Sequence, residues 1–171
     1  MPRPSDGDFG EFYKRYILLA TGESPEAVIA LHSSFISDYI SHLPETASDY
    51  AYDTGKWTVK QLLQHLLDTE RILTYRLLRI SRGDLSPLSG FDENAFAAAA
   101  PAHNRKLQDL KEEILTLRKS TDILIASLTD EELKQKGEAS GYAVTANALC
   151  FMIIGHYLHH IQILKERYAL V

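Results

Sequence analysis

The chain has 171 residues, of which 45% are apolar and 24% charged, and these values are ordinary for one globular domain. Its formal net charge of −5, with no block of basic residues, argues against nucleic-acid binding. The single cysteine, Cys150, excludes a disulfide within the chain and suits a reducing compartment. Neither a signal-peptide pattern nor an apolar stretch approaching ~18 residues is found. We therefore expect a cytoplasmic protein with no membrane partner.

The chain begins with a segment that we expect to be an extension, residues 1–23, carrying one short helix within "FGEFYKRYILLAT". The main domain is expected over residues 24–171, and its first long helix over 25–43. Ser24 suits the N-cap and Pro25 the first helical position, while Pro44 ends the helix. Its apolar positions recur at helical spacing: Val28, Leu31, Phe35, Ile36, Tyr39 and Leu43.

The second long helix is predicted over 58–82, in "TVKQLLQHLLDTERILTYRLLRISR". Thr58 and Gln61 are spaced for a capping box, in which each side chain accepts a hydrogen bond from a free backbone N–H. Gly83 suits the end of the helix. One apolar face is formed by Leu62, Leu66, Leu73, Leu77 and Ile80.

The segment "PLSGFDENAFAAAAP" is expected to be a loop with one short helical piece that ends at Pro101. A third long helix is predicted over 103–128, with "TDEEL" after it as a short capped turn and "GEASGYAV" as a loop. The last helix, capped by Thr145, is predicted over 146–168. Four long amphipathic helices and no convincing strand predict an all-α fold, a four-helix bundle.

Two histidines interrupt the apolar stripe of the last helix. His156 and His160 lie one turn apart in a series that also contains Leu149, Ile153 and Ile163. A buried imidazole without partners costs on the order of 1–3 kcal/mol, and two in succession compound that cost. A divalent metal would satisfy both, because neutral imidazole is its commonest ligand.

A metal site needs a third ligand, for which His65 is the best candidate, beside Leu62 and Thr69 on the second helix. A partnered core histidine is the alternative for His65. His159 lies about 60° from His156 around the helix and could replace it as a ligand. We instead expect His159 to lie beside the ligands or to line a cleft. Asp68, one turn after His65, could orient an imidazole or be an ordinary paired carboxylate.

Two familiar metal motifs are excluded. In "HYLHH" the position of the catalytic glutamate of a zincin is held by Tyr157. No pair of Glu-x-x-His motifs is present, so a di-iron carboxylate bundle is not supported.

The sequence resembles the DinB/YfiT-like family. The stretch "GKWTVKQLLQHLLDTERILTYRL" is similar to the family signature of a tryptophan, a capped helix, and then His, Asp and Glu. "GHYLHHIQIL" resembles its closing motif, and "FDENAF" fits its intervening segment. The resemblance covers roughly residues 25–168. It implies a four-helix bundle of metalloenzymes, often dimeric, with a divalent ion, commonly nickel or zinc, on His65, His156 and His160.

The resemblance says less about the reaction. Relatives include thiol-dependent transferases and isomerases that use low-molecular-weight thiols, and others are labelled hydrolases. A divalent ion on three neutral imidazoles keeps open positions, where it can hold a thiol as thiolate or lower the pKa of a bound water to about 7. We expect thiol transfer ahead of hydrolysis, because no zincin-type glutamate is present. A non-catalytic metal-binding bundle is the third alternative.

The expected substrate is a small molecule, with a low-molecular-weight thiol as partner. No catalytic residue is predicted beyond the metal centre itself. By helix geometry, the residues expected to lie beside the ligands or to line the cleft are Asp68, Thr69, Met152 and His159.

Overall fold

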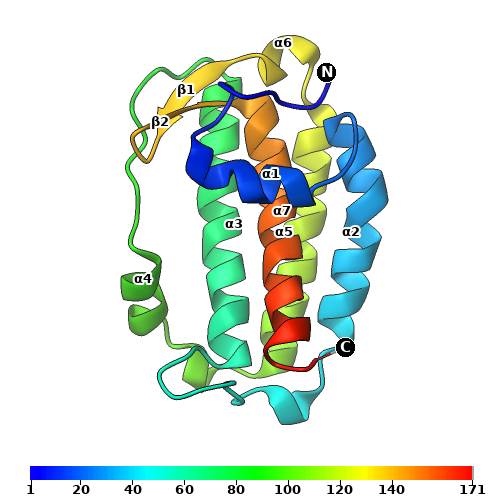
Figure 1. Cartoon of the computed structure of the whole chain (residues 1–171), viewed down its shortest axis with the longest axis vertical. Coiled ribbons are helices and arrows are strands. Elements are labelled where there is room, and N and C mark those ends of the chain that lie inside the picture. Colours follow the sequence, from blue (N-terminus) through cyan, green and yellow to red (C-terminus); the bar gives the residue numbers. More distant parts are fainter. Residues whose placement is uncertain (171) are drawn as a thin grey trace.

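The structure is a computed structural model that describes residues 1–170. Four long helices run along the long axis of the molecule (Figure 1) and confirm the predicted four-helix bundle. They are α2 (Pro25–His42), α3 (Val59–Ser81), α5 (Leu107–Ser127) and α7 (Ala146–Glu166). Shorter helical segments are η1 (Glu11–Tyr13), α1 (Lys14–Leu19), η2 (Glu45–Ala47), α4 (Glu93–Ala99), η3 (Ala102–Asn104) and α6 (Asp130–Leu133).

The direction of the helices depends on one long connection. Figure 1 shows α2 and α7 running one way along the axis and α3 and α5 running the other way. Between α3 and α5 the chain returns along the outside of the bundle, through residues 82–106 with α4 and η3. As a result α3 lies antiparallel to α7, and side chains near the middle of both helices face each other.

The predicted caps form at three of the long helices. Ser24 accepts a hydrogen bond from the backbone N–H of Ala27, and Thr145 from that of Ala148. Thr58 and Gln61 make the capping box. The third long helix begins at Leu107 instead of the predicted 103, because Ala102–Asn104 forms a separate turn of 3₁₀-helix.

The predicted loop "GEASGYAV" is wrong, because it forms a β-hairpin. β1 (Lys136–Ala139) pairs antiparallel with β2 (Tyr142–Thr145), and Lys136 lies opposite Thr145. Ser140 and Gly141 make the two-residue turn with φ of 54° and 79°, the left-handed values that such a turn requires. Four-residue strands of which half the residues are exposed carry too little hydrophobic alternation to be recognised in the sequence.

The face that α2 turns to the bundle is narrower than predicted. Leu31 is 58% exposed and Phe35 is 42% exposed, whereas Val28, Ile36 and Ile40 are buried. The predicted apolar stripe is therefore wrong at Leu31 and Phe35. No helix within residues 1–170 has both the length and the apolar character needed to cross a membrane.

The N-terminal helix α1 lies across the middle of α7 (Figure 1). The two backbones come so close at Gly155 that a Cβ there would lie 2.0 Å from the carbonyl oxygen of Tyr16. Glycine is therefore required at this crossing. The guanidinium of Arg3 donates to the carbonyl oxygens of Ala20 and Gly22 and holds the end of α1 in place.

Candidate metal centre and adjoining cavity

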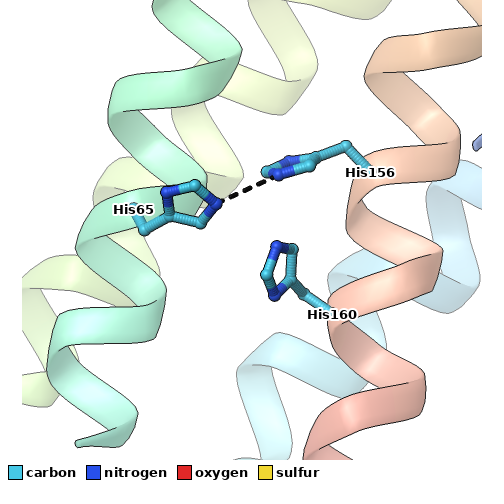
Figure 2. Close-up of side chains that lie close together, drawn as sticks. All are labelled: His65, His156 and His160. Carbon is cyan, nitrogen blue, oxygen red and sulfur yellow. Dashed lines mark hydrogen bonds between the residues drawn. The ribbon is translucent and has the colours of Figure 1, made fainter. Parts of the chain in front are cut away.

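Three imidazoles converge in the interior between α3 and α7. His65 projects from α3 and His156 and His160 from α7, and their rings turn toward one another (Figure 2). One nitrogen from each lies within 4.8 Å of the others. The Nε2 atoms of His65 and His156 are 3.1 Å apart. The spacing of four residues places His156 and His160 on one face of α7, and the antiparallel α3 brings His65 opposite them.

Burial keeps all three imidazoles neutral. It lowers the pKa of His65 to about 4, and the neighbouring His159 adds to that shift. It also lowers the pKa of His156 and His160 well below the ordinary value, and the adjacent imidazoles add to the effect. Neutral imidazole is the form that ligates metal, so the protein maintains the triad in a state ready for a cation.

The hydrogen bonding of the triad fits a site for a cation. Nδ1 of His160 is buried without any partner within residues 1–170. At a zinc–nitrogen distance of about 2.0–2.1 Å, two tetrahedral ligand atoms lie roughly 3.4 Å apart. The Nε2 atoms of His65 and His156 are 3.1 Å apart, which is close to this value. The three candidate ligand atoms together lie within 4.8 Å of one another, so a small rotation of an imidazole would bring all three to the tetrahedral spacing. The residues present therefore fit a divalent ion held by three histidines.

Neighbouring side chains orient the triad. Oγ1 of Thr69 lies 3.4 Å from Nδ1 of His65, so that Nε2 is left facing His156. The Trp57 ring lies against the other side of His65, with ring centroids 4.9 Å apart. Tyr16 of α1 covers His156 edge-on at 5.5 Å between centroids. Such contacts fix the direction in which a ligating ring points.

The residues predicted to surround the triad fall into two groups. Thr69 and Met152 line a cavity together with His156. His159 lies outside that lining, half-buried between the rings of Tyr16 and His160. Asp68 does not contact an imidazole, because its carboxylate accepts a hydrogen bond from Gln64 and faces a separate depression beside α4.

The cavity next to the triad has a volume of 360 Å³. It lies between α1, α3, α7, the hairpin and the segment before α4. Its walls are largely aromatic and aliphatic, and its polar groups include Arg76 and Glu93. The lining residues from α1 and the segment before it are Phe12, Tyr13 and Tyr16, and those from the rest of the chain include Leu73, Phe91, Ser140 and Tyr142. An ion on the triad would be reached from this cavity through His156.

Two features of this region were missed in the sequence. Arg76 follows Thr69 by seven residues and so lies on the same face of α3. It is a charged residue on an apolar helix face, which is the same kind of signal that singled out His156 and His160. The other feature is a buried network in which Glu70 accepts hydrogen bonds from Arg118 of α5 and from the hydroxyl of Tyr157 of α7, at 2.6 and 2.7 Å. No local pattern reveals that these three residues meet.

Comparison with known proteins agrees with this architecture. The model of the DinB superfamily matches residues 36–164, three quarters of the chain. This chain belongs to the DinB superfamily. No curated protein sequence gave a significant match.

Two solved structures are similar to this DinB-superfamily protein. YfiT from Bacillus subtilis, described as a probable metal-dependent hydrolase with an unusual four-helix bundle topology, has a TM-score of 0.68 and 19% identity, over 100% of this chain and 94% of that chain. A mycothiol-dependent maleylpyruvate isomerase has a TM-score of 0.64 and 15% identity. The match covers 88% of this chain but 59% of the isomerase, so this chain spans less than two thirds of that protein. At these identities the likeness establishes the fold.

Proposed function

We propose that this protein is a metal-dependent enzyme acting on a small molecule, with a divalent ion, nickel or zinc, held by His65, His156 and His160. The observation that carries the proposal is that the buried triad adjoins a cavity of 360 Å³ through His156. A closed structural zinc site normally has four protein ligands, and the cluster here has three. The arrangement therefore favours catalysis over the third alternative, a non-catalytic bundle stapled by metal.

Thiol transfer is the reaction that we place first. When bound here, a divalent ion would supply Lewis acidity that favours the deprotonated form of a thiol or of water. Within residues 1–170, Glu93 is the one carboxylate that lines the cavity, and it is exposed to solvent. A thiol needs no such protein base once its proton is lost, whereas hydrolysis gains from one. The isomerase of similar fold is described as mycothiol-dependent, which supports a low-molecular-weight thiol as the partner.

Hydrolysis of a small ester or amide is the second candidate. The structure of YfiT, similar over the whole of this chain, is described as that of a probable metal-dependent hydrolase. In both reactions the roles of the protein side chains are the same. Thr69 and Trp57 orient His65, Tyr16 and Met152 exclude water from one side of the triad, and the aromatic walls hold the apolar part of the substrate.

The test uses protein loaded with cobalt or nickel and three thiols: cysteine, glutathione and bacillithiol. We expect one of them to produce a sulfur-to-metal charge-transfer band in the visible or near-ultraviolet spectrum, and His156→Ala to remove it. An unchanged spectrum with excess of all three thiols, together with hydrolysis of a small ester, would move hydrolysis ahead. If removing the metal unfolds the bundle and no thiol or water exchanges at the metal, the non-catalytic alternative is correct.

The proposal includes two statements about the cellular context. The protein acts in the cytoplasm without a nucleic-acid or membrane partner, which its acidic charge and its free, buried Cys150 support. It forms a homodimer, for which the exposed Leu31 and Phe35 on α2 offer an apolar face. Sedimentation as a 19.3 kDa species over a wide range of concentrations would contradict the dimer.

A further inference from the structure

Arg76 is a buried cation without an acidic partner. Its residue is 3% exposed, and none of the ion pairs within residues 1–170 includes it. Its Nη2 donates hydrogen bonds to the carbonyl oxygen of Ser89 at 2.8 Å and to Oγ of Ser140 at 3.0 Å. Burial lowers the pKa of its guanidinium, with the nearby Tyr13 opposing that effect. A guanidinium nevertheless stays protonated at physiological pH, so a positive charge lies here without a carboxylate at ion-pair distance.

The other buried basic side chains have a clear structural partner. Arg118 pairs with Glu70 and Asp122, and Lys60 pairs with Asp49. Lys111 donates to the carbonyl oxygens of Ser41 and Leu43 at the C-terminal end of α2, where a helix dipole favours a cation. Of the basic residues buried in the described chain, Arg76 alone has neither a carboxylate nor a helix end to balance its charge. Its hydrogen bonds to Ser89 and Ser140 tie neighbouring segments to α3, but they do not explain why a charged residue is used there.

The position of Arg76 connects it with the triad. It lines the same cavity as His156 and follows Thr69 and Leu73 along one face of α3. With a rise of 1.5 Å per residue, the seven residues from Thr69 to Arg76 span about 10 Å of the helix axis. The cavity thus has the guanidinium toward one end, the triad toward the other, and apolar walls such as Leu73, Phe91 and Met152 between them.

We propose that this cavity binds a substrate with an apolar body and a single carboxylate, and that Arg76 anchors the carboxylate while the reacting end lies at the triad. A planar guanidinium matches a carboxylate geometrically and forms stronger hydrogen bonds to it than to a neutral acceptor. The aromatic walls exclude water, which strengthens the pair. Glu93, which also lines the cavity, contributes a negative charge and disfavours ligands of higher charge such as a phosphate. This inference deepens the proposed function, because it names the substrate class for the same site.

The binding test needs neither a thiol nor catalysis. The probes are 4-phenylbutyrate, its neutral amide, and the corresponding phosphonate, titrated calorimetrically into the full-length protein as purified and after treatment with a chelator. We expect the carboxylate to bind at least about tenfold more tightly than the amide in both preparations, because a hydrogen bond between two charged groups is stronger than one to a neutral acceptor. Equal affinity for carboxylate and amide, tighter binding of the phosphonate, or no binding of the carboxylate at millimolar concentration would overturn the inference.

Variants locate the anchor. Arg76→Gln should abolish the preference for the carboxylate, and Arg76→Lys should retain part of it. Arg79→Gln is the matched control, since Arg79 lies on the same helix but is already paired with Asp84. A preference that survives in Arg76→Gln would overturn the assignment. If Arg76→Gln folds poorly, the comparison of carboxylate and amide binding to the wild-type protein still tests the inference. If the carboxylate preference is present while the metal-loaded protein shows no spectral change with any thiol, the inference stands and the proposed thiol reaction fails.

Discussion

At the scale of single residues, the unpartnered Nδ1 of His160 and the close approach of His65 to His156 are the most informative contacts in the molecule. Three neutral imidazoles that face one another in an apolar interior lose hydrogen bonds to water and recover few within the protein. Apolar residues would pack in the same volume without that cost. The arrangement is therefore best explained by a ligand that all three nitrogens share.

Replacement of any one of the three histidines should abolish stoichiometric metal. His65→Ala, His156→Ala and His160→Ala each leave two ligands, which hold a divalent ion far more weakly than three do. The measurement is elemental analysis of untagged protein. His42→Ala is the control, because His42 is exposed at the end of α2, where its Nδ1–H donates to the carbonyl oxygen of Asp38. One metal per chain in the triple variant would show that the site lies elsewhere.

At the scale of elements, the crossing of α1 over α7 positions the aromatic wall of the cavity. Gly155 lets the backbone of Tyr16 approach α7, and Tyr16 in turn covers His156 and His159. The N-terminal segment thus contributes side chains to the site, although it precedes the four long helices in the sequence.

Gly155→Ala should displace α1. The added Cβ would overlap the Tyr16 carbonyl, which is backbone and cannot rotate away, so a loss of about 1–3 kcal/mol in the free energy of unfolding is expected. Denaturant titration measures this loss, and near-ultraviolet circular dichroism should report a changed tyrosine environment. Gln162→Ala, exposed on the same helix, should stay within about 0.5 kcal/mol of wild type. Equal stability of the two variants would contradict the close crossing.

A second contact between elements is the buried network of Glu70, Arg118 and Tyr157, which joins α3, α5 and α7. Glu70 and Arg118 are each 1% exposed, so their charges depend on each other. Nε of Arg118 lacks a hydrogen-bond partner within the described residues, which adds to the cost of burying this pair. The network fixes the register of three helices next to the triad, since Tyr157 directly follows His156.

Breaking this pair should cost far more than removing it. Arg118→Met leaves the Glu70 carboxylate buried without a cation and should lower the free energy of unfolding by about 3–5 kcal/mol. In the double variant with Glu70→Leu, much of that loss should be recovered, because the fully buried carboxylate is gone and Asp122, the other partner of Arg118, is 18% exposed to water. The exposed pair of Arg82 and Glu132 provides the control, for which a change of about 0–1 kcal/mol is expected. Additive losses in the double-mutant cycle would rule out the coupling.

At the scale of the whole molecule, the burial of the triad makes the stability of the metal-free protein depend on pH. The pKa of His65 is about 4 in the folded chain and about 6.5 in an unfolded one. Between these values the unfolded state binds more protons, so stability is complete above pH 6.5 and falls as the pH decreases toward 4. His156 and His160 act in the same direction, because burial lowers their pKa as well.

Chelated protein should therefore become less stable on acidification from pH 7.5 to pH 5. His65 alone should account for about 2 kcal/mol of the loss, by the linkage relation. Denaturant titrations of wild type and of His65→Gln at both pH values measure the change in the free energy of unfolding between pH 7.5 and pH 5. This change should be smaller in the variant. His42→Ala should keep the wild-type dependence. An unchanged pH dependence in His65→Gln would mean that His65 titrates normally in the folded state.

Metal should add to the stability of the protein at neutral pH. An ion that binds only the folded state adds about 4 kcal/mol at a concentration 1,000 times its dissociation constant. Thermal unfolding with and without nickel or zinc at pH 7.5 checks this, and the gain should vanish at pH 5 or below, where protons compete for the imidazoles. A metal-induced shift in the His156→Ala variant equal to that of wild type would contradict binding at the triad.

The sequence by itself determined the four long helices, most of their limits and the histidines that meet. These features depend on local chemistry: caps at Ser24, Thr58 and Thr145, and a period of three to four residues that places His156 and His160 on one face. The tertiary structure decided what depends on contacts between distant segments. The hairpin at Ser140, the crossing at Gly155 and the pairing of Glu70 with Arg118 have no local signal, since each partner looks ordinary within its own helix or loop. Arg76 was visible as a charge on the apolar face of α3, but only the folded chain shows that no carboxylate within residues 1–170 pairs with it and that it lines the cavity beside the triad.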